Sequence, residues 1–198
     1  MLKKLCSLSA VFVFALSILF LSIEKTSIGA QPGLAAASLK FTVSEEATPS
    51  AEPKVNYYLP YPGILPDSPL YKIKMVRDRV WLWLTPEPVS KAEKLLLYSD
   101  KRVGAGKALI EGGQVPLGIS TILKGEKYLE RAILETEKAQ KQGLKVNSLI
   151  EKVEKASLGH EEILSSLKQK VNSEGQESLD NILSFLKPLQ NKASGLND

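Results

Sequence analysis

The sequence predicts an all-α protein, with antiparallel helical hairpins that form a bundle of about five helices behind a proline-rich extended strap. Three observations lead to this prediction. From about residue 69 onward, apolar residues recur at alternating steps of three and four, which is the spacing of one helix face. Glycine and proline interrupt that pattern at intervals, so consecutive helices must fold back on one another. After residue 55, no stretch alternates apolar and polar residues as a half-buried strand would.

The strap is predicted just before the first helix. Four prolines between residues 60 and 69 exclude a helix there and favour an extended path. Large apolar side chains nevertheless occur along it, which a solvated linker would not need, so we expect the strap to pack across the helices. These side chains are Tyr58, Leu59, Tyr61, Ile64 and Leu65.

The helices are expected in the following order. Ser68 caps a first helix from Pro69 to about Leu84, and Thr85 with Pro86 starts a second that ends near residue 112. A third helix covers about 117–142. A fourth begins at or near a capping-box pattern at Ser148 and reaches a turn at 172–175. A shorter fifth helix ends before Pro188.

Each of the later helices has a seam of residues that we expect to be buried. These are Ala92, Leu96, Ser99, Val103, Gly106 and Ile110 in the second; Ile119, Ile122, Leu129, Ile133 and Thr136 in the third; Leu149, Val153, Ala156, His160, Ile163 and Leu167 in the fourth; and Leu179, Ile182, Leu183 and Leu186 in the fifth. The glycines at 104 and 106 fit either a close helix crossing or a weak point in the second helix.

The first helix is apolar on two sides. One side carries the stripe Leu70, Ile73, Val76 and Val80, and basic residues and both tryptophans share the helix. It could lie on anionic lipid or a wall polymer, or between the strap and the bundle. The two-sided pattern favours the second interpretation, so we expect the stripe, Ile64, Leu65 and at least one of Trp81 and Trp83 to be buried. The candidate interaction surface is the second side with its neighbours: Tyr71, Met75, Trp81, Leu82, Arg77 and Arg79.

The N-terminus predicts export. Lys3 and Lys4 precede an uncharged stretch at residues 5–23, as in a signal peptide, and Ala30 is a plausible cleavage site. An uncleaved anchor, which would contact the membrane through residues 1–23, stays open. We therefore expect an extracytoplasmic protein, secreted or anchored by its N-terminus. Its parts are a signal peptide or anchor (1–30), a disordered linker (31–55), a helical domain (56–190) and a frayed tail (191–198).

The composition points away from catalysis. The net charge is +4, and removing residues 1–30 removes three lysines and one glutamate, so the rest is nearly balanced and nucleic-acid binding is not expected. Cys6 lies in the leader, and His160 is the single histidine. We expect His160 to be a structural residue of the fourth-helix seam, and we expect no catalytic residue, cofactor or metal. Glu126, Glu130, Glu135 and Glu137 are interpreted as ordinary salt-bridged helix surface.

The segment Tyr61-Pro-Gly-Ile-Leu-Pro-Asp-Ser-Pro-Leu-Tyr71, followed by a basic-aromatic helix ending at Leu84-Thr85-Pro86, resembles a bacterial family of exported helical domains. That family is catalogued as a domain of unknown function, and the resemblance extends over roughly Tyr58 to Ala193. It implies an extracytoplasmic helical domain and supplies no reaction or site residues.

The leading functional hypothesis is an exported, non-enzymatic helical protein of the cell envelope that binds another envelope protein or a wall component. The alternative is a tethered ligand-binding or sensor bundle, which needs an apolar pocket between helices lined by a few polar groups. A hydrolase is the third hypothesis, and it needs paired carboxylates in a cleft.

Overall fold

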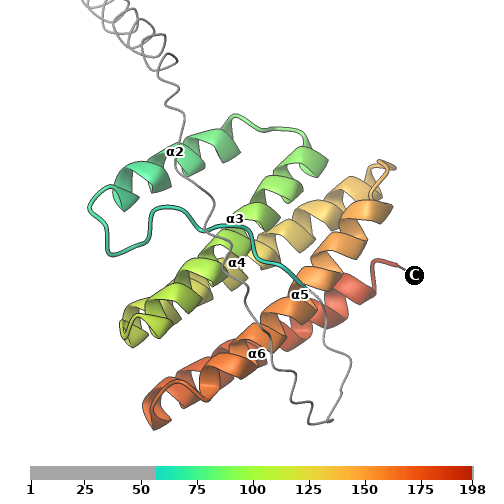
Figure 1. The fold of residues 1–198 in the computed structure, drawn as a ribbon. Helices are drawn as coiled ribbons and strands as arrows, with labels where there is room; N and C mark the ends of the chain where they lie inside the picture. Colours follow the sequence, from blue (N-terminus) through green and yellow to red (C-terminus); the bar gives the residue numbers. More distant parts are fainter. Residues whose placement is uncertain (1–56, 198) are drawn as a thin grey trace, which may run out of the picture. The chain divides into compact units, whose positions relative to one another are not determined.

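The computed structural model describes residues 57–197 as five α-helices joined by short connections (Figure 1). The helices are α2 (Tyr71–Trp83), α3 (Pro88–Glu111), α4 (Val115–Lys141), α5 (Asn147–Lys168) and α6 (Ser173–Ser194). The all-α prediction is confirmed, because these residues contain no strand. None of the helices in this part of the chain is both long and apolar enough to cross a membrane. The predicted leader and linker lie outside the described residues.

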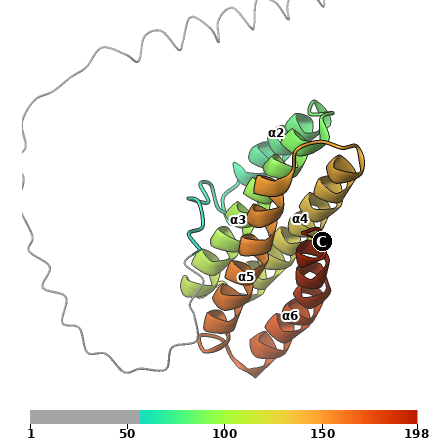
Figure 2. The same ribbon diagram turned by 90° about the vertical axis from the view of Figure 1, so that its right-hand side faces the viewer.

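Helices α3 to α6 lie side by side as two antiparallel hairpins, α3 with α4 and α5 with α6 (Figures 1 and 2). Gly113 and Gly143 end α3 and α4 with φ angles of 82° and 72°, a backbone region that glycine enters without steric cost. Contacts of α3 with α5 and of α4 with α6 join the two hairpins into one four-helix bundle. Helix α2 lies outside this bundle and packs against α3.

The seams predicted for the bundle helices are confirmed. Most of their residues are buried, and Val103, Ile122, Ile133, Val153 and Leu179 have no exposed surface. Burial of such side chains contributes roughly 1.5–3 kcal/mol each and is the main favourable contribution to the stability of a fold without disulfides. Three seam residues at the edges of the core are only partly buried: Ile119, Ile163 and Leu183.

A pair of glycines sets the distance between α3 and α4. A Cβ atom built on Gly106 would lie 2.7 Å from the carbonyl oxygen of Gly118, and a Cβ on Gly118 would lie equally close to the carbonyl of Gly106. Two turns away, Ser99 Oγ donates a 2.8 Å hydrogen bond to the carbonyl of Gly125. The close-crossing interpretation is therefore correct for Gly106.

The strap crosses α3 and α5. A Cβ on Gly159 of α5 would collide with the ring of Tyr57, and a Cβ on Gly104 of α3 would lie 3.7 Å from the side chain of Leu59. Further along, Lys74 on α2 donates to the carbonyl oxygens of Pro62 (2.6 Å) and Ile64 (3.1 Å). These contacts fasten the strap to both the bundle and α2.

Three predicted helix starts are wrong. Helix α2 begins at Tyr71 instead of Pro69, and no side chain caps it, so Ser68 is not its cap. Glu87 caps α3, because its carboxylate accepts hydrogen bonds from the amides of Val89 (3.0 Å) and Ser90 (2.6 Å). Thr85 instead ends α2, donating to the carbonyl of Trp81 at 2.6 Å. Helix α5 begins without a side-chain cap, so the capping box expected at Ser148 does not form.

Helix α6 is longer than predicted, because it continues through Pro188 to Ser194. Proline cannot donate to the carbonyl of Ser184, but both residues lie on the exposed side, where water can reach that carbonyl. The inner side remains apolar past the proline and buries Ala193 and Leu196. Gln140 of α4 also donates to the carbonyl of Leu196 at 2.8 Å. The part of the predicted frayed tail from 191 to 196 is therefore packed.

Candidate functional site

The most exposed apolar surface among the described residues is the outer side of α2. Ile73 is 68% exposed, Val76 64% and Trp83 81%. The prediction that this stripe is buried was wrong, because the stripe faces solvent. The related expectations also fail: Ile64 is exposed, Leu65 is only half-buried, and Trp81 is 58% exposed. We call this surface the outward stripe, and its members are Leu70, Ile73, Val76, Val80, Trp83 and Leu84.

The bundle side of α2 is polar and aromatic, which explains the reversal. Asp78 is buried at 2% exposure and Leu82 at 6%. Beneath them, the guanidinium of the buried Arg102 lies 4.1 Å from the ring centroid of Tyr128 and its Nη2 lies 3.9 Å from Met75 Sδ. Arg102, held in place by its stacking on Tyr128, contacts the Met75 thioether, and this contact, together with the burial of Asp78 and Leu82, accounts for the side of α2 that turns inward.

The predicted interaction surface is split by this orientation. Leu82 is buried, Tyr71 is half-buried, and Met75 faces Arg102, so these three belong to the contact between α2 and α3. Burial raises the pKa of the Tyr71 hydroxyl, as expected at such a contact. The other three residues, Arg77, Arg79 and Trp81, are exposed to solvent, and Met75 is also 39% exposed although it contacts Arg102.

A basic recess of about 390 Å³ adjoins the outward stripe where α2 meets α3 and α4. Trp83 belongs to both the stripe and the recess, so the two surfaces are continuous. Arg79 and Arg131 line the recess with Lys91, whose charge is paired with Glu135 at 2.5 Å. Within residues 57–197, neither arginine forms an ion pair. The recess therefore carries positive charge that the fold does not neutralise.

A second unusual feature lies inside the bundle. His160 has no exposed surface, as predicted, and both of its ring nitrogens face carboxylates. Nε2 lies 3.0 Å from Oδ1 of Asp100 on α3, and Nδ1 lies 3.1 Å and 3.3 Å from Oε1 and Oε2 of Glu126 on α4. We call Asp100, Glu126 and His160 the carboxylate–histidine cluster; it joins three helices.

The electrostatics of the cluster favour a charged imidazole. Burial disfavours the charged ring, but the charge of Glu126 and the hydrogen bonds to Asp100 and Glu126 outweigh burial and raise the pKa of His160 to about 9. A ring protonated on both nitrogens can donate to both carboxylates. Tyr57 covers the cluster from the strap, with its ring edge 77° to the imidazole at 6.0 Å between centroids. Burial and the hydrogen bond to Asp100 raise the pKa of the Tyr57 hydroxyl.

The cluster was only half predicted. Glu126 was assigned to the helix surface, yet it has no exposed surface. The sequence did indicate that Glu126 is buried, since it follows the seam residue Ile122 by four positions and precedes the seam residue Leu129 by three. Asp100 follows Ser99, so helical spacing places it only at the edge of the α3 seam. Because no solvent reaches the imidazole, the cluster is built to hold charge and join helices, and it cannot meet a substrate in this conformation.

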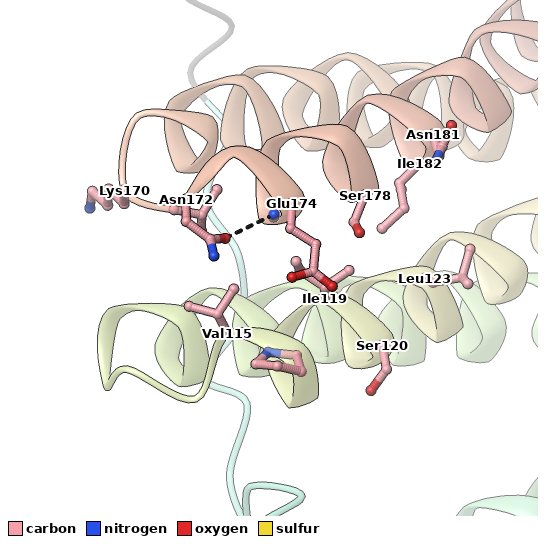
Figure 3. A pocket seen from close by; sticks show the side chains of 13 residues that line it. Val115, Ile119, Ser120, Leu123, Lys170, Asn172, Glu174, Ser178, Asn181 and Ile182 are labelled. Carbon is pink, nitrogen blue, oxygen red and sulfur yellow. Dashed lines mark hydrogen bonds between the residues drawn. The ribbon is translucent and has the colours of Figure 1, made fainter.

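An open groove of about 630 Å³ lies where the first turns of α4 and α6 face each other (Figure 3). Val115, Ile119 and Leu123 form one wall and Ile182 belongs to the other, while the carboxylate of Glu174 points into the space between the helices. Asn172 holds the start of α6 by accepting a 3.0 Å hydrogen bond from the amide of Gly175. No predicted site residue lines this groove.

The fold and these surfaces define a small all-α domain with an apolar and basic outer helix. Comparison with protein families agrees at the level of the domain: the chain belongs to the family of DUF5667, a domain of unknown function, which matches residues 63–174, more than half of the chain. The resemblance to such a family is thereby confirmed. Neither the curated proteins nor the solved structures gave a match.

Proposed function

We propose that this protein is an exported, non-enzymatic helical module of the cell envelope that binds another envelope component through the outer side of α2. The observation that carries the proposal is the outward stripe. A soluble protein gains nothing from exposing a continuous row of aliphatic and aromatic side chains, and such patches mark interaction sites. The stripe also lies on a helix whose other side is already occupied by the bundle.

Two further observations support a binding role. The charged N-terminus and the uncharged stretch at residues 5–23 direct the domain out of the cytoplasm, where envelope proteins, wall polymers and lipid surfaces are the available partners. The histidine and carboxylates closest to an acid–base arrangement are sealed under Tyr57, and the exposed carboxylates near lysines form surface ion pairs. This arrangement favours a binding module over a hydrolase.

The proposal is tested by fractionation. A chain that begins at Gln31 is incubated with the membrane, wall and soluble fractions of the producing cell's envelope, and retention in each fraction is measured. We expect Ile73→Ser with Val76→Ser to abolish retention, because both side chains are exposed and their loss leaves the core intact.

The control is Leu134→Ser with Leu158→Ser, two leucines on α4 and α5 that are 45% and 40% exposed. These substitutions remove exposed apolar surface away from α2 and should leave retention unchanged. Equal retention of wild type and the α2 variant would show that the outward stripe is not the binding surface.

The groove between α4 and α6 favours a second candidate, a tethered ligand-binding bundle. It combines an apolar wall on α4 with polar side chains that come mainly from the start of α6, a mixture that a small molecule could use, although it is open at the surface and not enclosed by the bundle. Ile119→Trp would fill this groove. If the groove is the functional site, that substitution and not the α2 pair would abolish retention or ligand binding.

A further inference from the structure

We propose that the partner of α2 is an anionic lipid bilayer, with the outward stripe lying in the membrane interface and the basic recess receiving a lipid phosphate. This inference rests on the proposed function and names the class of partner. It concerns contact along the surface, because a 13-residue helix is only about 20 Å long, too short to span a bilayer.

The composition of the stripe matches a bilayer interface. Aliphatic side chains of Leu70, Ile73, Val76 and Val80 form a continuous row, and Trp83 stands at its end with 81% of its surface exposed. Tryptophan concentrates at the boundary between headgroups and acyl chains, since its ring is apolar and its N–H can still reach water. Helices that lie in the interface combine such an apolar side with basic edges.

The charges of α2 are arranged for an anionic surface. Lys72, Arg77 and Arg79 are exposed, whereas Asp78, the single acidic residue of the helix, is buried on the bundle side. Of these three basic residues, Arg77 is the one that forms an ion pair within the described residues, with its Nη2 2.8 Å from Oδ1 of Asp78. The solvent side of α2 therefore presents only positive charge around the stripe.

The recess adds a place for a phosphate group. Arg79 and Arg131 come from two different helices and converge beside Trp83, at the point where the stripe ends. A lipid whose chains contact the stripe would place its headgroup at this position. Arginine favours phosphate oxygens because its planar guanidinium can donate two parallel hydrogen bonds.

The order of the chain is consistent with this partner. Helix α2 is the first helix after the strap, and the uncharged stretch at residues 5–23 brings the same chain to a membrane during export. If that stretch is retained, the bilayer contact is a second anchoring signal on one chain, and two weak signals together give stable attachment.

The test uses the full chain, because both of its tryptophans lie on α2 and their fluorescence reports that helix alone. The chain is reconstituted into vesicles whose acyl chains carry bromine, a contact quencher of tryptophan. One set of vesicles contains phosphatidylcholine alone and the other a mixture of phosphatidylcholine and phosphatidylglycerol. We expect quenching in the anionic vesicles only, and we expect high salt to reduce it.

Charge variants sharpen the test. Each basic side chain near an anionic surface favours docking by about fivefold, so Arg79→Gln with Arg131→Gln should lower the ratio of docked to undocked α2 by about 30-fold. The control, Lys155→Gln with Lys187→Gln, removes the same charge from exposed positions on α5 and α6 and should quench like wild type.

The outcomes separate this inference from the proposed function. Absence of quenching, or equal quenching in both kinds of vesicle, overturns the anionic bilayer as partner. If α2-dependent retention in the wall or soluble fraction nevertheless persists, the proposed function stands with another partner. If retention also fails to depend on Ile73 and Val76, both proposals are wrong.

Discussion

Nε2 of His160 on α5 lies 3.0 Å from Oδ1 of Asp100 on α3, a contact between residues 60 positions apart. With Glu126 on α4 at the other ring nitrogen, one imidazole joins three helices. Two carboxylates around one cation leave excess negative charge in the core, and burying it costs free energy that only close pairing offsets. Because each ring nitrogen faces a carboxylate on a different helix, the cluster ties the register of α3, α4 and α5 together.

Replacing the histidine should strongly destabilise the fold. His160→Ala leaves two buried carboxylates without a cation, and the loss of one partner from a buried ion pair costs about 3–5 kcal/mol. Urea unfolding followed by circular dichroism gives the free energy of unfolding. Adding Asp100→Asn and Glu126→Gln to His160→Ala should recover part of that loss, because the unpaired charges are removed. A triple variant no more stable than His160→Ala would contradict this origin of the cost.

Stability should fall as pH rises toward 9. The pKa of His160 is raised from 6.5 to about 9, so the folded state holds a proton that the unfolded chain releases at lower pH. This contribution is fully present below pH 6.5 and is lost through pH 9, on the order of 3 kcal/mol. Titration of the Tyr57 hydroxyl does not interfere with this measurement, because its pKa is raised above the ordinary value of 10.0. His160 is the single histidine, so its NMR signal can be followed directly, and titration near 6.5 would refute the account.

The glycine crossing can be tested on one helix. Gly106→Ala places a methyl group 2.7 Å from the carbonyl oxygen of Gly118, and we expect the forced separation of α3 and α4 to cost about 1–3 kcal/mol. Gly104→Ala, two residues earlier, meets nothing closer than 3.7 Å and should be neutral or stabilising by up to ~1 kcal/mol from helix propensity. Melting temperatures of the two variants decide the point, and equal shifts would exclude a close crossing.

The strap should stabilise the fold through its first described residue. Tyr57→Phe removes the hydroxyl that bonds to Asp100, and a hydrogen bond to a charged group contributes about 1.5–3 kcal/mol. Tyr58→Phe is the control, because the neighbouring tyrosine is 82% exposed. If urea unfolding gives the same stability for both variants, the strap does not close over the cluster.

The sequence predicted the bundle better than its outer helix, and the reason is physical. Seams of α3 to α6 could be recognised because each helix has one apolar side, so periodicity alone decides which side is buried. Helix α2 has two candidate sides. The choice between them depends on Arg102, which stacks on Tyr128 and contacts Met75. The spacing of apolar residues along α2 carries no information about these contacts. The end of α6 was predicted too early, at Pro188, for a similar reason. Burial of the apolar side of α6 outweighs the one backbone hydrogen bond that the proline removes.

The site was predictable to the same extent. His160 was expected in the core from its seam position, and Glu126 sits on a seam as well, but its charge argued for the surface. Pairing between residues of three helices becomes visible only when the helices are placed. The basic recess likewise combines Arg79 with Arg131, two residues 52 positions apart, and nothing in the local sequence of either indicates the other.

The most direct test of the account is an environment-sensitive dye on α2. In a full chain carrying Cys6→Ser, Ile73→Cys provides one attachment point on the outward stripe, and Asn181→Cys provides one in the groove between α4 and α6. Envelope material is then added and dye emission recorded. The account predicts a blue shift at position 73 and none at position 181. A shift at 181 with none at 73 would contradict it and move the functional surface to the groove.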